Sequence, residues 1–284
     1  MPRPVFEKRR RKAFLSCSYA LTRIRPACLS LMLLLMLAGC IDKSKFTPEP
    51  DTARRELALK DVTYDEQSFI ENAGNGEVIN VKLFLAAGMN PNAVNTKGDT
   101  ALIAAASGGQ PGVIDVLLAH GADIKATDKR GLTAMMRAAV ESRADAIQAL
   151  LKHGADVNSM GNVGATALMY ASIKGDREVW QTLLDAKADV NARDKDVGTA
   201  LAWAAEYNRL ELTEELLARG ADPNIKNDSG GTPLMIAAYK GKQEIVRALL
   251  DKGADTRAKD NDGLTAQKWA LRGRHDETAK MLKQ

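Results

Sequence analysis

Two of the three histidines in the chain occupy one recurring position. His120 and His153 lie 33 residues apart, and each directly precedes a Gly-Ala-Asp sequence at the expected end of a helix. A partly charged imidazole is stabilised there by the helix dipole. No cysteine and no pair of acids is placed to converge on either ring, so the sequence predicts no metal site.

The aspartate of this motif recurs once in each 33-residue unit. Its copies are Asp123, Asp156, Asp189, Asp222 and Asp255. A carboxylate repeated in this way is typical of a turn, because Asp accepts hydrogen bonds from nearby backbone N–H groups. The stretch 108–112 is glycine-rich but lacks the Lys and Ser/Thr of a phosphate-binding loop, and the repeats contain no Ser-His-Asp or Cys-His order. We therefore expect neither catalysis nor a cofactor.

The elements that carry these residues are two short helices per unit, most clearly at Gly230–Asp255 (GGTPLMIAAYKGKQEIVRALLDKGAD). Thr232 is suited to cap the first helix, and Pro233 suits its first position. Gly241 breaks that helix, and the apolar spacing after it predicts a second helix that ends at Gly253. Neither helix can bury its apolar face alone, so the unit must stack on copies of itself.

Copies of this unit occur along most of the chain. The capping threonine recurs every 33 residues, as Thr100, Thr133, Thr166, Thr199, Thr232 and Thr265. With segments such as GGTPLMIAAYKG and KHGADVNSMGNVGATALMYAS, this period resembles the ankyrin repeat. The resemblance implies an all-α solenoid over residues 64–284, built from helix-turn-helix units with short β-hairpin fingers. We expect about seven units, of which the first and last serve as caps.

The units depart from the ankyrin pattern at two kinds of position. The His that usually follows Pro-Leu is replaced by residues such as Met136 and Met169, so apolar packing must take its place. Lys187 replaces a helix-ending Gly, and Val197 replaces a finger Gly. A left-handed conformation costs a non-Gly residue about 1–2 kcal/mol. We therefore expect the finger near 187–198 to be distorted or mobile, with Gly198 taking over the turn.

The net charge of +4 does not describe the repeats. Residues 1–39 hold eight of the 40 basic residues and one of the 36 acids, which leaves 32 basic and 35 acidic residues in the remainder. The positive charge therefore indicates a targeting segment and not a nucleic-acid surface. The apolar stretch that follows, Ala27–Gly39, has 13 residues and is too short for a bilayer span of about 20.

This apolar stretch ends in Leu37-Ala38-Gly39-Cys40, which resembles a bacterial lipobox. The resemblance implies a lipoprotein signal peptide at 1–39, cleaved before a Cys40 that carries lipid. The alternatives are an ordinary secretory signal and an uncleaved membrane anchor. Residue 41 is Ile and not the Asp that signals inner-membrane retention, which implies the periplasmic side of the outer membrane. An inner-membrane lipoprotein and a secreted protein remain alternatives.

Residues 40–63 are the expected link between this anchor and the repeats. Pro48, Pro50 and several charged residues leave little apolar periodicity, which favours a flexible tether. The alternative is a short helix at 53–60 that packs on the first repeat.

The first helices of the units carry the residues best suited to binding a partner. Counted from each capping threonine, positions +4, +7 and +8 lie on the side that faces the concave groove in ankyrin proteins. The candidates there are Arg137, Tyr170, Trp203, Tyr207, Tyr239 and Trp269. Tyr, Trp and Arg dominate interface hot spots. The alternative is that the +4 side chains are half-buried spacers between neighbouring helices.

These patterns predict a monomeric, non-catalytic scaffold that binds another protein in its groove and the membrane through Cys40. A narrower alternative is an immunity or antagonist protein that neutralises a toxin or hydrolase in the periplasm. A secreted ankyrin effector is a further alternative. An enzyme or ligand carrier is disfavoured, because no site in the sequence presents convergent polar groups.

Overall fold

The computed structural model describes residues 48–283. The expected signal peptide at 1–39, the lipidation site Cys40 and the first part of the tether lie outside these residues. A compact unit begins at Glu49. Among the described residues, no helix is both long enough and apolar enough to cross a membrane.

The described part of the chain forms fifteen helices. They are α3 (Pro50–Leu59), α4 (Glu66–Gly74), α5 (Val78–Ala86), α6 (Ala101–Gly108), α7 (Pro111–Ala119), α8 (Ala134–Val140), α9 (Ala144–Lys152), α10 (Ala167–Lys174), α11 (Arg177–Asp185), α12 (Ala200–Glu206), α13 (Leu210–Ala218), α14 (Pro233–Tyr239), α15 (Gln243–Asp251), α16 (Ala266–Arg272) and α17 (Asp276–Met281).

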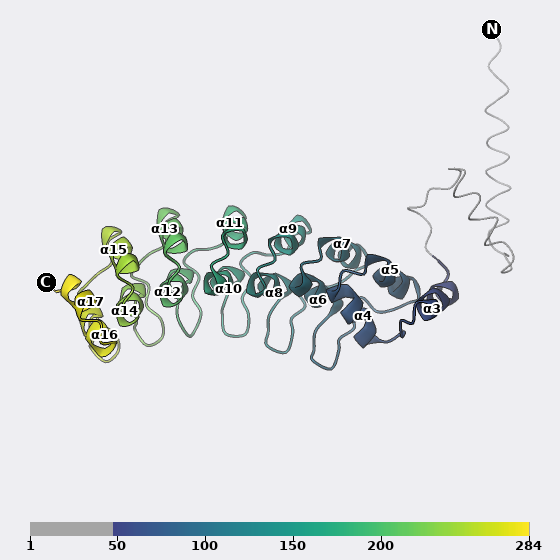
Figure 1. The fold of residues 1–284 in the computed structure, drawn as a ribbon, viewed down its shortest axis with the longest axis horizontal. Coiled ribbons are helices and arrows are strands. Elements are labelled where there is room, and N and C mark those ends of the chain that lie inside the picture. The colour runs from purple at the N-terminus through teal and green to yellow at the C-terminus, as the bar shows by residue number, and fades with distance from the viewer. Residues whose placement is uncertain (1–47, 284) are drawn as a thin grey trace, which may run out of the picture. The chain divides into compact units, whose positions relative to one another are not determined.

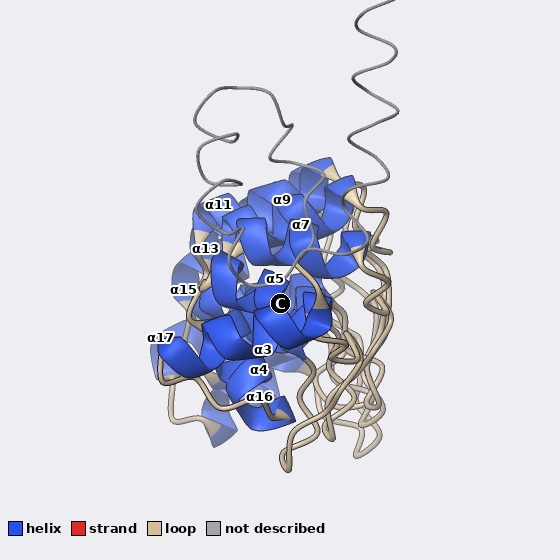
Figure 2. Cartoon of the chain, turned by 90° about the vertical axis from the view of Figure 1, so that its right-hand side faces the viewer, coloured by secondary structure: helices blue, strands red, loops and turns tan. Residues whose placement is uncertain are grey.

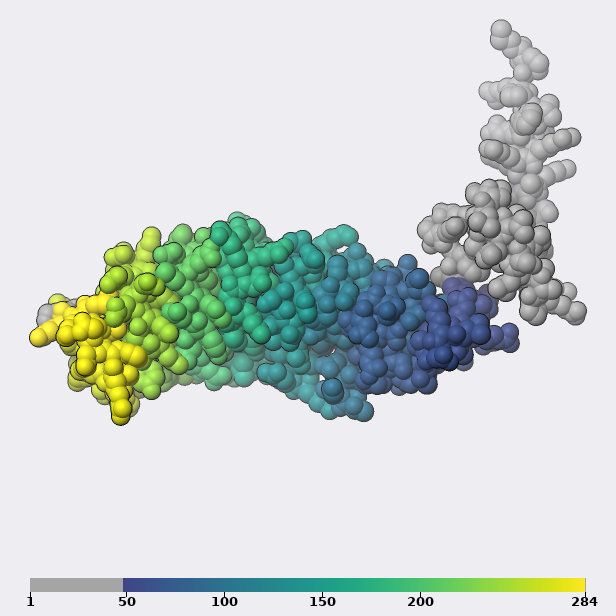
Figure 3. Space-filling view, in the orientation of Figure 1, coloured from purple at the N-terminus to yellow at the C-terminus, as the bar shows by residue number. Residues whose placement is uncertain are grey.

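From α4 onward these helices form two parallel rows (Figure 1). The first-helix row contains α4, α6, α8, α10, α12, α14 and α16, and the second-helix row contains α5, α7, α9, α11, α13, α15 and α17. Each helix packs against the other helix of its unit, and neighbouring units pack along both rows. The colour bands of Figure 3 follow one another without a break, as expected for units that contact only their neighbours.

The first helices from α6 to α16 each begin at a threonine of the 33-residue ladder, whereas α4 begins at Asp65. The hydroxyls of Thr133 and Thr232 accept hydrogen bonds from the backbone N–H groups of Met136 and Met235, each at 3.3 Å. These bonds satisfy N–H groups that the first turn of a helix leaves unpaired. The predicted helix end at Gly253 is also confirmed, because this residue is left-handed with φ +82°.

The core lies between the two rows and between successive units. Alanines on the packed face of the first helices, such as Ala105 and Ala138, are fully buried. Their small side chains let neighbouring helices approach closely. Met136 and Met169, which stand where ankyrin repeats usually have His, are each 1% exposed. Apolar packing therefore fills this position, as the sequence predicts.

The fingers that join the units differ from the expected β-hairpins. We define them as residues 95–99, 128–132, 161–165, 194–198, 227–231 and 260–264. Within residues 48–283 they form no sheet, only isolated bridges between Val94 and Thr100 and between Thr127 and Thr133. In finger 128–132 the Asp128 carboxylate accepts two of the backbone N–H groups. Because a side chain satisfies these groups, no strand ladder is needed. Figure 2 shows the fingers together on one side of the helices.

Residues 53–60 belong almost entirely to a short helix that packs on the first repeat, which was the alternative to a flexible tether. Helix α3 packs against α5, and its Ala53 and Leu57 are fully buried. The Arg54 guanidinium lies 4.9 Å from the centre of the Tyr64 ring, and the Tyr64 hydroxyl donates to the Ala87 carbonyl at 3.0 Å. The flexible spacer expected up to residue 63 is therefore wrong for Pro50–Leu59, because this segment has an apolar side that α5 covers.

The finger 194–198 is distorted, as the sequence predicts. Lys187 is left-handed with φ +66°, and Gly198 takes φ +114°. In regular fingers the glycine N–H donates back across the turn, as from Gly131 to the Asp128 carbonyl at 2.9 Å. Among the described residues Val197 makes no such backbone bond. The left-handed residue is therefore displaced by one position, to Gly198, while the closing bond from the Asp194 N–H to the Gly198 carbonyl keeps its place at 2.8 Å. The mobility of this finger stays a prediction.

Candidate protein-interaction groove

The histidines singled out in the sequence form surface contacts at the ends of α7 and α9. His120 Nδ1 lies 2.8 Å from the Val116 carbonyl oxygen, and His153 Nε2 lies 2.6 Å from Asp115 Oδ1. The hydrogen bond from His153 lowers the pKa of the Asp115 carboxyl. Within residues 48–283, no group of three or more His, Cys, Asp and Glu side chains could hold a metal ion.

The recurring aspartates form the predicted turns, and a second ladder that sequence reasoning missed connects the units. Asp222 Oδ1 accepts from the N–H of Asn224 at 2.8 Å. The Asn224 side chain then bridges to the next unit, accepting from the Asp255 N–H and donating to the Gly253 carbonyl. Three more asparagines accept from the next unit in the same way, namely Asn92, Asn158 and Asn191. An Asn two residues after the turn position was the signal for this structural ladder.

The predicted partner-binding residues all lie on one side of the first-helix row. We call this side, which bears positions +4, +7 and +8, together with the fingers beside it, the groove face. Arg137 lies on α8, Tyr170 on α10, Trp203 on α12 and Trp269 on α16, while Tyr239 ends α14 and Tyr207 follows α12. Five successive units therefore contribute to this face.

The structure brings four of the aromatic candidates into two pairs. The rings of Trp203 and Tyr207 stack with centres 5.9 Å apart and an interplanar angle of 5°. The ring of Tyr239 meets that of Trp269 edge-on, at 6.0 Å and 79°. The two pairs lie on α12, α14 and α16, and an ion pair of 2.6 Å between Glu206 and Lys240 links α12 to α14 beside them. Such ring contacts limit side-chain motion before any partner binds.

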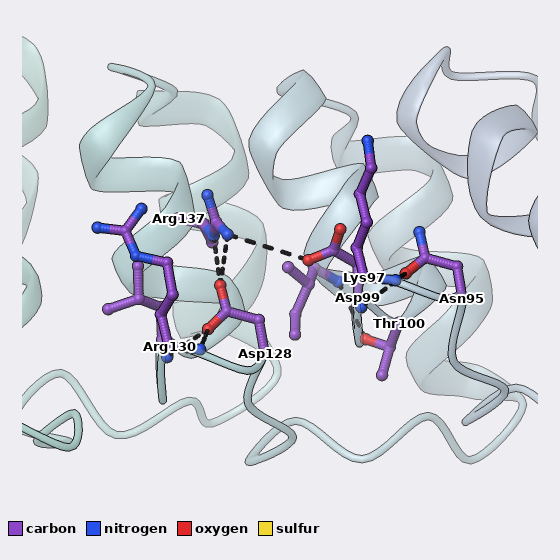
Figure 4. A network of polar contacts seen from close by, with 9 residues as sticks. Asn95, Lys97, Asp99, Thr100, Asp128, Arg130 and Arg137 are labelled. Atoms are coloured by element: carbon purple, nitrogen blue, oxygen red, sulfur yellow. Dashed lines mark hydrogen bonds and ion pairs between the residues drawn. The ribbon is translucent and has the colours of Figure 1, made fainter.

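Tyr170 and Arg137 stand apart from these ring pairs. Tyr170 has no ring contact among the described residues, and its burial raises the pKa of its hydroxyl. The Arg137 side chain instead meets two carboxylates of the fingers (Figure 4). Its Nε donates to Asp128 Oδ2 at 2.7 Å, and its Nη2 lies 4.0 Å from Asp99 Oδ1.

The two tryptophans of the groove face make the same kind of contact as Arg137. Trp203 Nε1 donates to Asp194 Oδ2 at 2.6 Å, and Trp269 Nε1 donates to Asp260 Oδ2 at 2.7 Å. In each pair the acid stands nine residues before its donor and belongs to the finger of the same unit. The sequence prediction missed these contacts, since helical periodicity does not relate residues nine apart across a finger.

Hydrogen bonds lower the pKa of two finger carboxylates, Asp128 and Asp260. Burial by itself raises the pKa of Asp128, but hydrogen bonds from the Leu132 N–H and the Arg137 guanidinium outweigh it, so the net pKa lies below its usual value. Burial likewise opposes the shift at Asp260, where the Leu264 N–H and the Trp269 indole lower the pKa. The side chain of Asp128 is only 1% exposed, so its charge depends on these donors.

Exposure divides the candidates into supporting and accessible residues. The +4 residues Arg137, Trp203 and Trp269 are half-buried, in agreement with the spacer alternative. Tyr207 and Tyr239 are 41% and 44% exposed, which is high for large apolar side chains. The two tyrosines are therefore the accessible rings of the two pairs, and the half-buried tryptophans pack against them.

A hollow of about 600 Å³ opens on the groove face between α4, α6 and α8, and Arg137 is the one predicted partner-binding residue that lines it. Its floor contains Gly74, Ala104 and Gly108. A Cβ on Gly108 would lie 2.1 Å from the Gly74 carbonyl oxygen, so close packing of α6 on α4 requires glycine there. The rim is charged and contains Glu71, Lys97, Asp99, Arg137 and Glu141. Small residues at these helical positions were the signal for a hollow.

Comparisons with known proteins agree with this architecture. The family model "Ankyrin repeats (3 copies)" matches residues 69–161, 125–194, 159–227 and 201–284. The human ASB11 ankyrin repeat domain is 26% identical with a TM-score of 0.67, over 76% of this chain and 97% of that one. The ankyrin repeat domain of Bcl-3, a member of the IkappaB protein family, is 28% identical with a TM-score of 0.65, over 75% and 97%. No curated protein matches. The chain belongs to the ankyrin-repeat family.

Proposed function

We propose that this protein is a scaffold that binds a partner protein on the groove face, with Tyr207 and Tyr239 as the main points of contact. Ankyrin-repeat proteins bind other proteins. The observation that carries the proposal is the exposure of these two tyrosines, each held against a tryptophan. A large ring that is already ordered loses little freedom on binding, which favours it as a hot spot.

Photo-cross-linking tests this surface directly. A photoreactive phenylalanine analogue replaces Tyr239 on the groove face or, as a control, the exposed Gln181 on α11. We expect a discrete protein adduct from position 239 in the native cell and none from position 181. The Tyr207→Ala variant of the position-239 probe should lose most of that adduct while its circular dichroism is unchanged. Equal adducts from the two faces would rule out the groove face as the binding surface.

The proposed location is the periplasmic side of the outer membrane, with lipid on Cys40 as the anchor. Support comes from the sequence around Cys40, which resembles a lipobox, and from Ile41 after it. Metabolic labelling with a clickable palmitate tests this assignment. The unaltered chain and Cys28→Ala should take up label, whereas Cys40→Ala should not. Label that persists in Cys40→Ala, or that is absent from the unaltered chain, would contradict lipidation at this residue.

A further inference from the structure

The finger residue and the +4 residue of each unit are matched in chemical type. The six pairs, in chain order, are Asn95 with Ala104, Asp128 with Arg137, Gly161 with Tyr170, Asp194 with Trp203, Asn227 with Ile236, and Asp260 with Trp269. An aspartate stands opposite a nitrogen donor each time. An asparagine stands opposite a side chain that cannot donate. Along the chain, units with a carboxylate at this finger position alternate with units that lack one.

The two oxygens of each finger aspartate explain this matching. In Asp194, Oδ1 accepts from the N–H groups of Asp196 and Gly198, at 3.1 and 2.7 Å, and so closes the finger. Its Oδ2 is then left for the Trp203 indole. In Asn227 the oxygen closes the finger in the same way, accepting from the Gly231 N–H at 2.8 Å. Its second group is an amide that donates, so a donor at +4 would find no acceptor.

We propose that Asp128, Asp194 and Asp260 are positioning residues that set the geometry of the groove face. Each carboxylate connects a finger to the first helix of its own unit and fixes the orientation of the +4 side chain. Asp194 is 3% exposed, so its free oxygen has little access to water as an alternative partner. Asp194 and Asp260 also orient the rings of Tyr207 and Tyr239, through Trp203 and Trp269 respectively. This last step rests on the proposed function of those tyrosines.

Asp→Asn substitutions test the orientation of the +4 side chain separately from closure of the finger. Asparagine keeps the oxygen that closes the finger, as Asn227 shows, and removes only the acceptor of the +4 donor. The chain contains three tryptophans, and Trp180 on α11 is buried away from the fingers, so its indole serves as an internal control. Indole N–H signals report each ring separately.

The experiment is nuclear magnetic resonance of the ¹⁵N-labelled full chain in mild detergent. In Asp194→Asn we expect the Trp203 indole proton to shift and to exchange with water at least ten-fold faster, with Trp180 and Trp269 unchanged. Asp260→Asn should affect Trp269 alone. An unchanged Trp203 signal in Asp194→Asn, or equal changes in all three tryptophans, would overturn the proposal. This readout needs no partner, so it stands or fails independently of the proposed function.

A paired substitution shows whether the matching itself matters. Asp194→Asn together with Trp203→Ile copies the natural pair of Asn227 and Ile236. We expect the midpoint of urea unfolding to fall in Asp194→Asn, where the Trp203 N–H loses its acceptor, and to return towards its original value in the double variant. A midpoint that falls further in the double variant would contradict a matched pair.

Discussion

At the scale of single residues, the finger aspartates link local turn chemistry to the groove face. One oxygen of each acid accepts backbone N–H groups of its own finger, beside the backbone bonds that close the turn, and the other holds a side chain on the neighbouring helix. A buried carboxylate is costly unless its acceptors are used, and here both oxygens are. The type of side chain at +4 is thus set by the finger residue nine positions earlier, which it contacts. Partner binding is not needed to explain it.

The lowered pKa of Asp128 predicts a pH dependence of stability. A carboxyl whose folded pKa lies below its unfolded value of about 3.9 contributes stability above that pH and loses it as the pH falls through the folded pKa. The charged side chain that contacts it is Arg137, which in turn lies 4.0 Å from Asp99. We therefore expect the unfolding free energy to fall more steeply below about pH 4 in the unaltered protein than in Asp128→Asn. Parallel curves from urea unfolding, or an Asp128 pKa above 3.9 by carbon NMR, would refute this.

Ala104 is the residue that keeps the hollow open. Ala104→Ile reproduces the natural Asn227–Ile236 combination beside Asn95, so we expect the free energy of unfolding to change by no more than about 0.5 kcal/mol. The filled hollow should lower the yield of the groove-face adduct several-fold if the partner enters it. Ala218→Ile, at an exposed site on α13, serves as the control. An undiminished adduct would show that the partner does not use this hollow.

At the scale of elements, α3 is the helix that closes the first end of the stack. Tyr64 and Phe84 stack with ring centres 5.7 Å apart, and Phe84 contacts Phe69 at 5.4 Å. Arg54 lies over the outer part of this cluster. The chain before the first repeat therefore protects apolar surface that an inner unit would cover with another repeat.

The buried face of α3 predicts a pair of contrasting substitutions. Leu57 is fully buried against α5, whereas Leu59 on the same helix is 85% exposed. Leu57→Ala should lower the unfolding free energy by about 2–4 kcal/mol through lost burial and an unfilled cavity. Leu59→Ala should change it by less than about 0.5 kcal/mol. Urea unfolding of the two variants decides the matter, and equal small effects would show that α3 does not cap the stack.

The backbone at Lys187 is in a strained, left-handed conformation. It is left-handed where five other units have left-handed glycines with no atom near enough to meet a Cβ, so only its backbone is strained. Lys187→Gly should therefore raise the unfolding free energy by about 1 kcal/mol. Lys252 has φ −103°, and Lys252→Gly should give no such gain. Thermal unfolding measures both, and a destabilised Lys187→Gly variant would be inconsistent with strain at this position.

The helices and their boundaries could be predicted because their signals are local. A threonine cap, a glycine stop and an apolar spacing act within a few residues, as in the unit of Thr232 and Gly253. Helix α3 was harder, since Ala53 and Leu57 gain their partner only when α5 has folded. The pairing of Asp194 with Trp203 was missed for a similar reason: the finger must first fold back on the helix. The partner-binding role of the six candidate residues stays a prediction.

At the scale of the whole molecule, units of one architecture form a groove face whose side chains differ from one unit to the next. The hollow lies over α4, α6 and α8, while the ring pairs lie over α12, α14 and α16. The core positions of these units are nearly the same from one unit to the next, because each must pack on its neighbours. The differences between units are therefore concentrated on the groove face, where they can specify a partner.

The most direct test of this account is hydrogen exchange of the full chain, free and bound to the partner that the position-239 adduct identifies. We predict protection on binding at α12, α14 and the fingers 194–198 and 227–231, with the exchange of α9, α11 and α13 unchanged. Protection confined to the second-helix row would contradict it.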